Sequence, residues 1–267
     1  MQNLSNLKIK IRCSPEELSE AQKLRFQVFN LEMNSGLKSS YATGLDQDAF
    51  DEDCEHVIIE DTKHHIVIGT YRMLLDQVAR KRKGFYSEKE FDLSPLLRLE
   101  GGLLEAGRSC IHKDYRRKSI LSFLWQGIAQ YAIEHHVRYI FGCASIFTVD
   151  PRKVNQTFCM LKKKRYFADL DVHPKDKEHG ISINEDLPCE HPEEIFNELP
   201  PLFKGYLNLG LKVCGTPAID REFQTTDFFV ILDIKHMNPS YKRRLFGNYL
   251  EENSASSKAE RKLYANP

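Results

Sequence analysis

Two charged side chains interrupt an otherwise apolar segment at residues 103–111. Glu105 could act as a general base, and Arg108 could hold a carboxylate through paired hydrogen bonds. Their spacing of three places them on opposite faces of a regular strand, unless Gly107 marks a β-bulge. The alternative interpretation is that the two side chains pair with each other or lie on a solvated face. The segment therefore gives a catalytic hypothesis that depends on a local irregularity.

A basic stretch follows this segment directly and precedes the clearest helical pattern of the chain. A helix N-terminus with nearby cationic side chains can bind a phosphate or a pyrophosphate. The alternative is a solvated cationic loop. The candidate anion-binding residues are Arg116, Arg117, Lys118 and Ser119.

Two motif matches are interpreted as chance. His56 and Asp61 match the H-x-x-x-x-D pattern of glycerolipid acyltransferases, but they lie on an expected strand, where residues five apart point to opposite faces. The segment Gly107-Arg108-Ser109 lacks the second glycine of a nucleophile elbow. The seven cysteines are scattered without a C-x-x-C pair, so we expect reduced thiols and no metal site.

The elements that must position these residues can be predicted from hydrophobic periodicity. Residues 7–13 alternate as a half-buried strand, and Ser14 with Glu17 forms a capping box that opens a helix bearing Leu18, Ala21, Leu24, Val28 and Leu31. A long polar loop with four aspartates occupies residues 34–53, and a loop of this length is usually functional. The further predictions are a hairpin (56–60 and 65–75), strands at 103–111, 138–146 and 226–234, helices at 116–136, 151–165 and 192–209, and irregular segments at 76–99 and 167–190.

This order of elements favours an α/β (α+β) fold with a mixed sheet and helices on its faces. The expected organisation is one domain over residues 1–250, with a core at 7–167 and a C-terminal extension at 168–250. Residues 251–267 are polar and are expected to form a flexible tail.

Composition excludes several classes of protein. The 267 residues contain 38 Lys and Arg against 38 Asp and Glu, so the net charge of zero argues against a nucleic-acid binder. No apolar run is long enough to span a bilayer, and no signal peptide is apparent, so a cytoplasmic location is expected. Basic clusters at 80–83, 116–118, 162–165 and 242–244 suggest an acidic partner, either a carrier protein or an anionic membrane touched peripherally.

Several separated motifs, in one order, resemble the bacterial ornithine-lipid N-acyltransferase family. They are LRFQVF (24–29), DAFDEDCEH (48–56), GTYR (69–72), FYSEKEF (85–91), EAGRSC (105–110), LWQGIA (124–129), FGCAS (141–145) and PPLFKGYL (200–207). The family is GNAT-like and distantly related to acyl-homoserine-lactone synthases. The resemblance implies a mostly antiparallel GNAT-like sheet and transfer of a 3-hydroxyacyl chain from acyl carrier protein to the α-amine of ornithine.

The resemblance also implies roles for individual residues. Glu105, Arg108 and Asp51 are the candidate catalytic residues, and Arg25, Phe29, Asp48 and Arg72 the candidate acceptor-binding residues. We expect the pantetheine arm to lie between splayed strands near 105–111 and 139–145. Its candidate contacts are Ser109, Cys110, Ile111, Arg116, Arg117, Lys118, Ser119 and Ser145.

The acyl donor and acceptor remain open in the sequence. Residues 116–121 lack the glycines of the GNAT pyrophosphate loop, which favours a carrier-protein thioester and leaves coenzyme A as second choice. No permanently bound cofactor is expected. The alternatives are glycine or another amino acid as acceptor, a coenzyme-A-dependent acetyltransferase, and a non-catalytic module that binds a carrier protein or a membrane surface.

Overall fold

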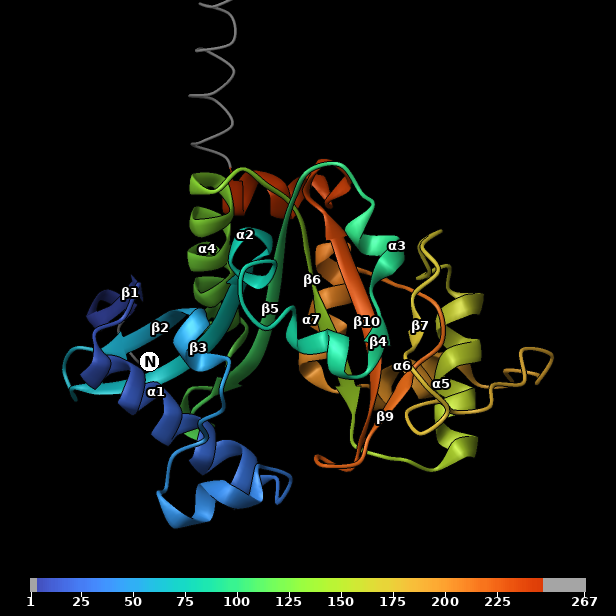
Figure 1. The fold of residues 1–267 in the computed structure, drawn as a ribbon, viewed down its shortest axis with the longest axis horizontal. Coiled ribbons are helices and arrows are strands. Elements are labelled where there is room, and N and C mark those ends of the chain that lie inside the picture. The colour runs from blue at the N-terminus through green and yellow to red at the C-terminus, as the bar shows by residue number, and fades with distance from the viewer. Residues whose placement is uncertain (1–3, 247–267) are drawn as a thin grey trace, which may run out of the picture.

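The computed structural model describes residues 4–246, with the side chains of Leu4 and Lys118 excepted. The tail expected at 251–267 lies outside the described residues. The main sheet runs in the order β1-β2-β3-β5-β6-β10-β8, with β9 also paired to β10 (Figure 1). Its strands are β1 (Leu7–Ile11), β2 (Glu55–Asp61), β3 (Ile66–Leu75), β5 (Gly102–Ile111), β6 (Val137–Ile146), β8 (Lys212–Val213), β9 (Ala218–Asp220) and β10 (Thr225–Asp233).

All the strand pairs of this sheet are antiparallel except β5 and β6, which are parallel. The expected mixed and mostly antiparallel sheet is confirmed, as are the hairpin and the strands that the alternation predicted. The expected C-terminal extension supplies β10, which pairs with β6 over eight residues. The extension thus completes the sheet.

Helices cover both faces of the sheet. One face packs against α4 (Lys118–Glu134), α5 (Pro151–Lys163), α6 (Pro192–Glu198) and α7 (Pro201–Leu209). The opposite face packs against α1 (Pro15–Phe26) and against residues 76–99, which contain α2 (Asp76–Ala79), α3 (Ser94–Leu97) and β4 (Phe91–Asp92). The segment expected to be irregular at 167–190 contains β7 (His173–Pro174), which pairs with β4. No described helix is long and apolar enough to cross a membrane.

The N-terminal helix begins as predicted and ends differently. The Ser14 side chain accepts a hydrogen bond from the Glu17 backbone, and the Glu17 carboxylate accepts one from the Ser14 backbone. After Phe26 the chain widens into a π-helical segment, Gln27–Glu32. The changed periodicity turns Leu31 outward, where it is 60% exposed, so its predicted place on the buried stripe is wrong.

The parallel strands β5 and β6 part halfway along their length. They pair from Gly102 and Val137 as far as Glu105 and Phe141, and beyond that point β5 pairs with β3 while β6 pairs with β10. At the closed end a Cβ on Gly142 would lie 2.4 Å from the Ala106 carbonyl oxygen, so only glycine allows this approach. The two strands therefore form a fork whose apex is at Glu105.

Candidate active site

The fork opens into a cavity of about 1010 Å³ that both faces of the sheet line. On the sheet face covered by α4 and α7, which we call the helical face, the wall is largely apolar and includes Trp125, Phe203 and Tyr206. On the opposite face it includes the polar residues Arg72, Ser87, Glu105, Arg108, Ser145, Asp220 and Asp227. The cavity thus joins an apolar half to a polar half through the gap between the strands.

Glu105 lies at the apex of the fork, on the cavity wall and only 5% exposed. Its carboxylate accepts hydrogen bonds from the Tyr86 backbone (2.7 Å), the Ser87 backbone (2.7 Å) and the Ser87 hydroxyl (2.5 Å). Burial raises the pKa of Glu105, although the bonds from Ser87 and Tyr86 and the charge of Arg72 oppose this effect. A carboxylate held in this way can accept a proton from a bound nucleophile.

The predicted β-bulge is present one residue after Gly107. Arg72 faces Gly107 and Thr70 faces Cys110, so β5 contains one more residue than β3 over this stretch. Arg108 takes up the irregularity with a positive φ of 51°. Its guanidinium pairs with Asp46 (3.3 Å) and Asp48 (3.1 Å), which rules out the interpretation that Arg108 pairs with Glu105.

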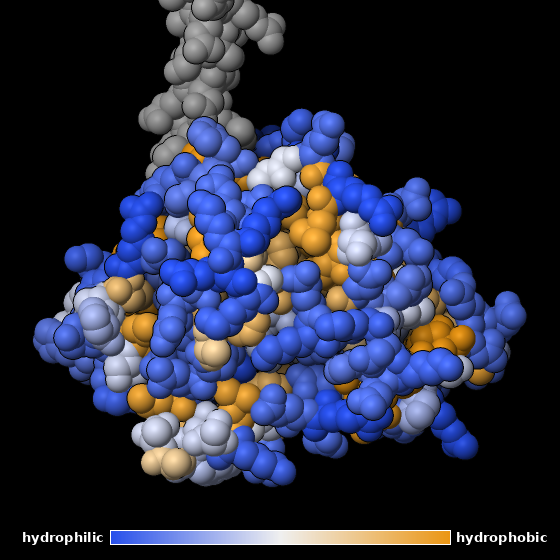
Figure 2. Space-filling view, viewed as in Figure 1, coloured by the Kyte–Doolittle hydropathy of each residue, from blue (hydrophilic) through white to orange (hydrophobic). Residues whose placement is uncertain are grey.

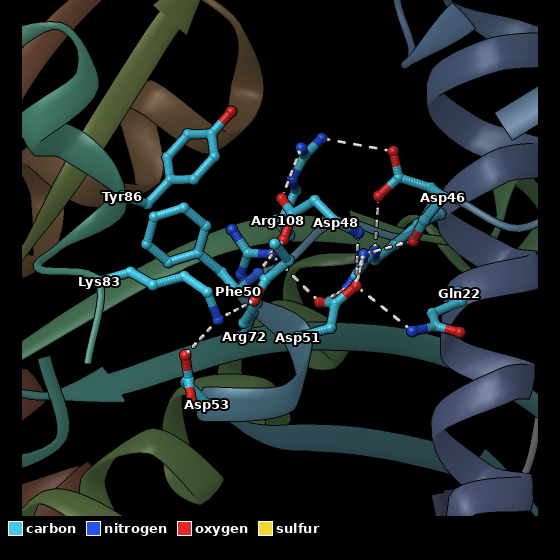
Figure 3. A network of polar contacts seen from close by, with 12 residues as sticks. Gln22, Asp46, Asp48, Phe50, Asp51, Asp53, Arg72, Lys83, Tyr86 and Arg108 are labelled. Atoms are coloured by element: carbon cyan, nitrogen blue, oxygen red, sulfur yellow. Dashed lines mark hydrogen bonds and ion pairs between the residues drawn. The ribbon is translucent and has the colours of Figure 1, made fainter. Parts of the chain in front are cut away.

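A buried network of arginines and aspartates fixes the long loop behind the cavity wall (Figure 3). Arg25, which is fully buried, binds Asp46 and Asp51 at 2.8 Å each, and Arg72 binds Asp48 (2.6 Å) and Asp51 (3.1 Å). Burial opposes ionisation of Asp51, but the hydrogen bond from Arg25 and the charges of Arg25 and Arg72 outweigh it and lower its pKa. Asp51 is therefore a permanent anion that anchors the loop.

The structure brings most of the predicted site residues to the cavity and places others elsewhere. Arg25, Asp48 and Asp51 do not line it; they belong to the ion-pair network behind the wall and position Arg72 and Arg108, which do line it. Ser119 lies in the first turn of α4 and does not line it, and the side chain of Lys118 is not described. The lining residues are Phe29, Arg72, Glu105, Arg108, Ser109, Cys110, Ile111, Arg116, Arg117 and Ser145.

Several cavity residues escaped sequence reasoning. Ser87 and Tyr86, whose backbone groups bind Glu105, lie in a segment without periodicity, so only the structure reveals them. Asp227 lies inside an apolar strand, as Glu105 does, and this same signal could have singled it out. On the helical face, the hydroxyls of Tyr206 and Tyr71 are hydrogen-bonded to each other, and burial raises the pKa of Tyr206.

The rejected motif matches have structural roles. His56 lies 3.9 Å from Asp51, whereas Asp61 accepts hydrogen bonds from Tyr115 (2.8 Å) and contacts His64 (2.9 Å). The two therefore share no partner. All seven cysteines are free thiols.

Comparison with known proteins adds the family. A family profile described as an acetyltransferase (GNAT) domain matches residues 24–126. The L-ornithine N(alpha)-acyltransferase of Brucella abortus (strain 2308) is 34% identical over 249 residues, covering 89% of this chain and 88% of that protein. The protein of the same name from Rhizobium meliloti (strain 1021) is 30% identical, covering 89% and 83%. The solved structure of the AHL synthase LasI has a similar fold, with a TM-score of 0.50 at 14% identity over 90% of this chain and 95% of LasI.

Proposed function

This chain belongs to the L-ornithine N(alpha)-acyltransferase family of GNAT-like enzymes, and we propose that its forked cavity is where an acyl thioester meets the α-amine of ornithine. The observation that carries this proposal is the position of Glu105. Its buried carboxylate lies where β5 and β6 part, at the junction between the apolar and the polar half of the cavity. A thioester entering from one side and an amine entering from the other would meet beside this group.

In the proposed reaction Glu105 takes a proton from the ammonium of the acceptor. The free nitrogen then attacks the thioester carbonyl, forming a C–N bond and a tetrahedral intermediate. Beyond Phe141 the two strands no longer pair with each other. Backbone N–H groups that face the gap between them would stabilise the oxyanion. The C–S bond then breaks as the nitrogen gives up a second proton to become the amide, and the departing thiolate takes that proton to leave as the thiol.

Arg108 is the better of the two candidate arginines for the acceptor carboxylate. Arg25, Arg72 and Arg108 balance Asp46, Asp48 and Asp51 in charge, so a further carboxylate needs a donor that this network leaves unused. The Nε of Arg108 is such a donor, because it is buried on a residue that lines the cavity and has no hydrogen-bond partner among the described residues. A substrate carboxylate there would satisfy it.

An acyl carrier protein is the proposed donor. The cavity is lined near its helical face by Arg116, Arg117, Lys204 and Arg244. The helix α4 begins beside them without a side-chain cap, which leaves N–H groups for a phosphate. A carrier presents a single phosphopantetheine phosphate on an acidic protein, which suits this basic rim better than the pyrophosphate of coenzyme A does.

The test is aminolysis by the purified protein. We expect N-acylornithine, identified by mass spectrometry, from ornithine and 3-hydroxyacyl carrier protein, with slower turnover of the matching coenzyme A thioester. Faster turnover of acetyl-coenzyme A would overturn the donor assignment. Acylation of glycine in preference to ornithine would overturn the acceptor assignment, and no consumption of any thioester would favour a non-catalytic binding module.

We also propose peripheral contact with an anionic membrane, where an acylated amino acid would be delivered. Leu31, Met33 and Tyr41 are exposed apolar side chains that lie close together in the sequence. Figure 2 shows patches of apolar surface among the polar residues on the face in view. Phe147, which lines the cavity, is 58% exposed. Flotation with anionic vesicles should recover the protein, and replacing Leu31 and Phe147 by serine should reduce recovery; unchanged recovery would contradict this contact.

A further inference from the structure

A second group of acidic side chains lies on the polar half of the cavity, outside the reaction described above. Asp227 and Cys143 line the cavity and Glu90 lies beneath them; their ligand atoms are all within 4.8 Å of one another. The strand register places Cys143, Ser145 and Asp227 on the same sheet face as Glu105. We call Glu90, Cys143 and Asp227 the acidic subsite.

Among the described residues, no cationic side chain forms an ion pair with the acidic subsite, although the charge of Lys89 acts on Glu90. Glu90 is 6% exposed and Asp227 7% exposed, and no salt bridge reaches either carboxyl group from residues 4–246. Oε2 of Glu90 is buried without a hydrogen-bond partner, and Asp227 accepts from Thr225 (3.1 Å). The ammonium of nearby Lys89 instead lies over the ring of Tyr86, 4.4 Å from its centroid.

Burial and electrostatic repulsion raise the pKa values of both carboxyl groups. Burial and the charges of Asp227 and Asp220 raise the pKa of Glu90 to about 9. Burial and the charge of Asp220 raise the pKa of Asp227 to about 6, although hydrogen bonds from Ser145 and Thr225 oppose this effect. Burying a carboxylate without a cationic partner costs free energy, so a ligand that supplies a cation would stabilise the ionised acidic subsite.

The acidic subsite is connected to Glu105 by a short path along the wall. The Ser87 hydroxyl donates to Glu105 and lies 3.6 Å from the Cys143 sulfur, which belongs to the acidic subsite. Ornithine carries its second amine at the end of three methylene groups. With its α-amine at Glu105, the side-chain amine could therefore reach the acidic subsite. A neutral amino acid would leave the acidic subsite without a partner.

We propose that Asp227, supported by Glu90, binds the side-chain ammonium of the acceptor and thereby selects a diamino acid. This inference rests on the proposed acylation of ornithine. Asp227 is the contacting residue, and Glu90 supports it from beneath. The selection follows from charge, because a buried anion that is paired only by the correct substrate penalises every analogue that lacks the cation.

The experiment compares ornithine with norvaline, which has the same carbon skeleton without the side-chain amine. The ratio of the two kcat/KM values is measured for the wild type, for Asp227→Asn and for Glu90→Gln. We expect the wild type to prefer ornithine strongly, Asp227→Asn to lower the ratio by roughly ten- to a hundredfold, the loss of one charged contact, and Glu90→Gln to lower it by less, because Glu90 acts through Asp227. The kcat/KM for norvaline should rise, because each substitution removes a carboxyl group that norvaline leaves unpaired, and circular dichroism checks that the variants fold. Asp169→Asn, an exposed acid outside the cavity, should leave the ratio as it is.

Each other outcome overturns the inference. If the wild type acylates ornithine and norvaline equally, or if the ratio survives both substitutions, the acidic subsite does not bind the ammonium, although acylation of ornithine still stands. If EDTA removes the preference of the wild type, the acidic subsite holds a metal ion instead. If ornithine is not acylated at all, the proposed function itself fails.

Discussion

At the scale of single residues, the site depends on where charge is compensated and where it is not. The carboxylates of the loop are neutralised by Arg25, Arg72 and Arg108, which makes them structural anions. Glu105 forms no ion pair and is compensated by hydrogen-bond donors from Tyr86 and Ser87 and by the nearby charge of Arg72, and burial still raises its pKa. Uncompensated carboxyl groups are the ones that remain available for proton transfer or for a cationic ligand.

Glu90 gives a stability test of this view. A raised folded-state pKa means that the folded protein keeps a proton that the unfolded chain releases, so stability falls as pH rises between the ordinary value of 4.5 and about 9. The slope is at most about 1.4 kcal/mol per pH unit. In urea denaturation without substrate, the free energy of unfolding of Glu90→Gln should increase relative to that of the wild type as the pH is raised from 5 to 9. Asp227, Asp220, Lys89 and Glu105 face this group and are common to both proteins. A constant difference across this range would contradict the assignment.

Sequence reasoning at this scale succeeded where a charge interrupted an apolar pattern and a glycine offered an irregularity. Glu105, Arg108 and the bulge were predicted in this way, and all three shape the cavity. Asp227 was missed because the strand at 226–234 was predicted from its apolar residues alone. Contacts such as Ser87 to Glu105 join residues 18 positions apart through an irregular segment, and no local pattern encodes them.

At the scale of elements, the fork depends on two glycines with opposite surroundings. Gly142 lies against Ala106 and keeps the closed end tight, whereas a Cβ on Gly107 would meet nothing within 4 Å. Gly107→Val should therefore keep the thermal stability of the wild type, because valine suits a strand. Its branched side chain should obstruct the gap and reduce kcat/KM for the thioester roughly tenfold, equivalent to about 1.4 kcal/mol. Gly107→Ala should reduce kcat/KM by less than Gly107→Val does. Full activity of the valine variant would contradict the proposal that the acyl donor passes through the fork.

The loop at 34–53 is held to α1 by Arg25, and this contact gives a prediction about folding. Arg25→Ala leaves Asp46 and Asp51 buried without their main cation, so the free energy of unfolding should fall by about 3–5 kcal/mol. Lys23→Ala on the same helix removes an exposed pair with Glu20 and should change stability by no more than about 0.5 kcal/mol. Equal denaturation midpoints for the two variants would show that the network does not anchor the loop.

The elements themselves were largely predictable because capping, alternation and helical spacing are local signals. The capping box, the hairpin and the helix α4 match their patterns. The π-helical segment after Phe26 was not predictable, since its sequence continues an α-helical stripe and tertiary contacts of the loop decide the outcome. The short elements within 76–99 likewise depend on tertiary packing, because their apolar side chains belong to the core on that face of the sheet.

At the scale of the whole molecule, the sheet separates two kinds of environment and the fork joins them. The C-terminal extension contributes to both, because Tyr206 on α7 lines the apolar half and Asp227 on β10 lines the polar half. A net charge of zero conceals this division into a basic rim and an acidic subsite. The family resemblance predicted the acyl transfer, which composition alone could not. The sequence did not reveal that the core and the extension both line the cavity, because the pairing of β6 with β10 joins residues far apart in the chain.

The most direct test of the account is the turnover of Glu105→Gln with ornithine and 3-hydroxyacyl carrier protein. Glutamine keeps the size of the side chain but cannot take the proton, so turnover should fall by about 10²–10⁴-fold. Thermal stability should be retained, and the variant should lose the rise in rate that the wild type shows as its carboxyl group ionises with increasing pH. Turnover equal to that of the wild type, with the same pH profile, would contradict the claim that Glu105 is the base at the centre of this cavity.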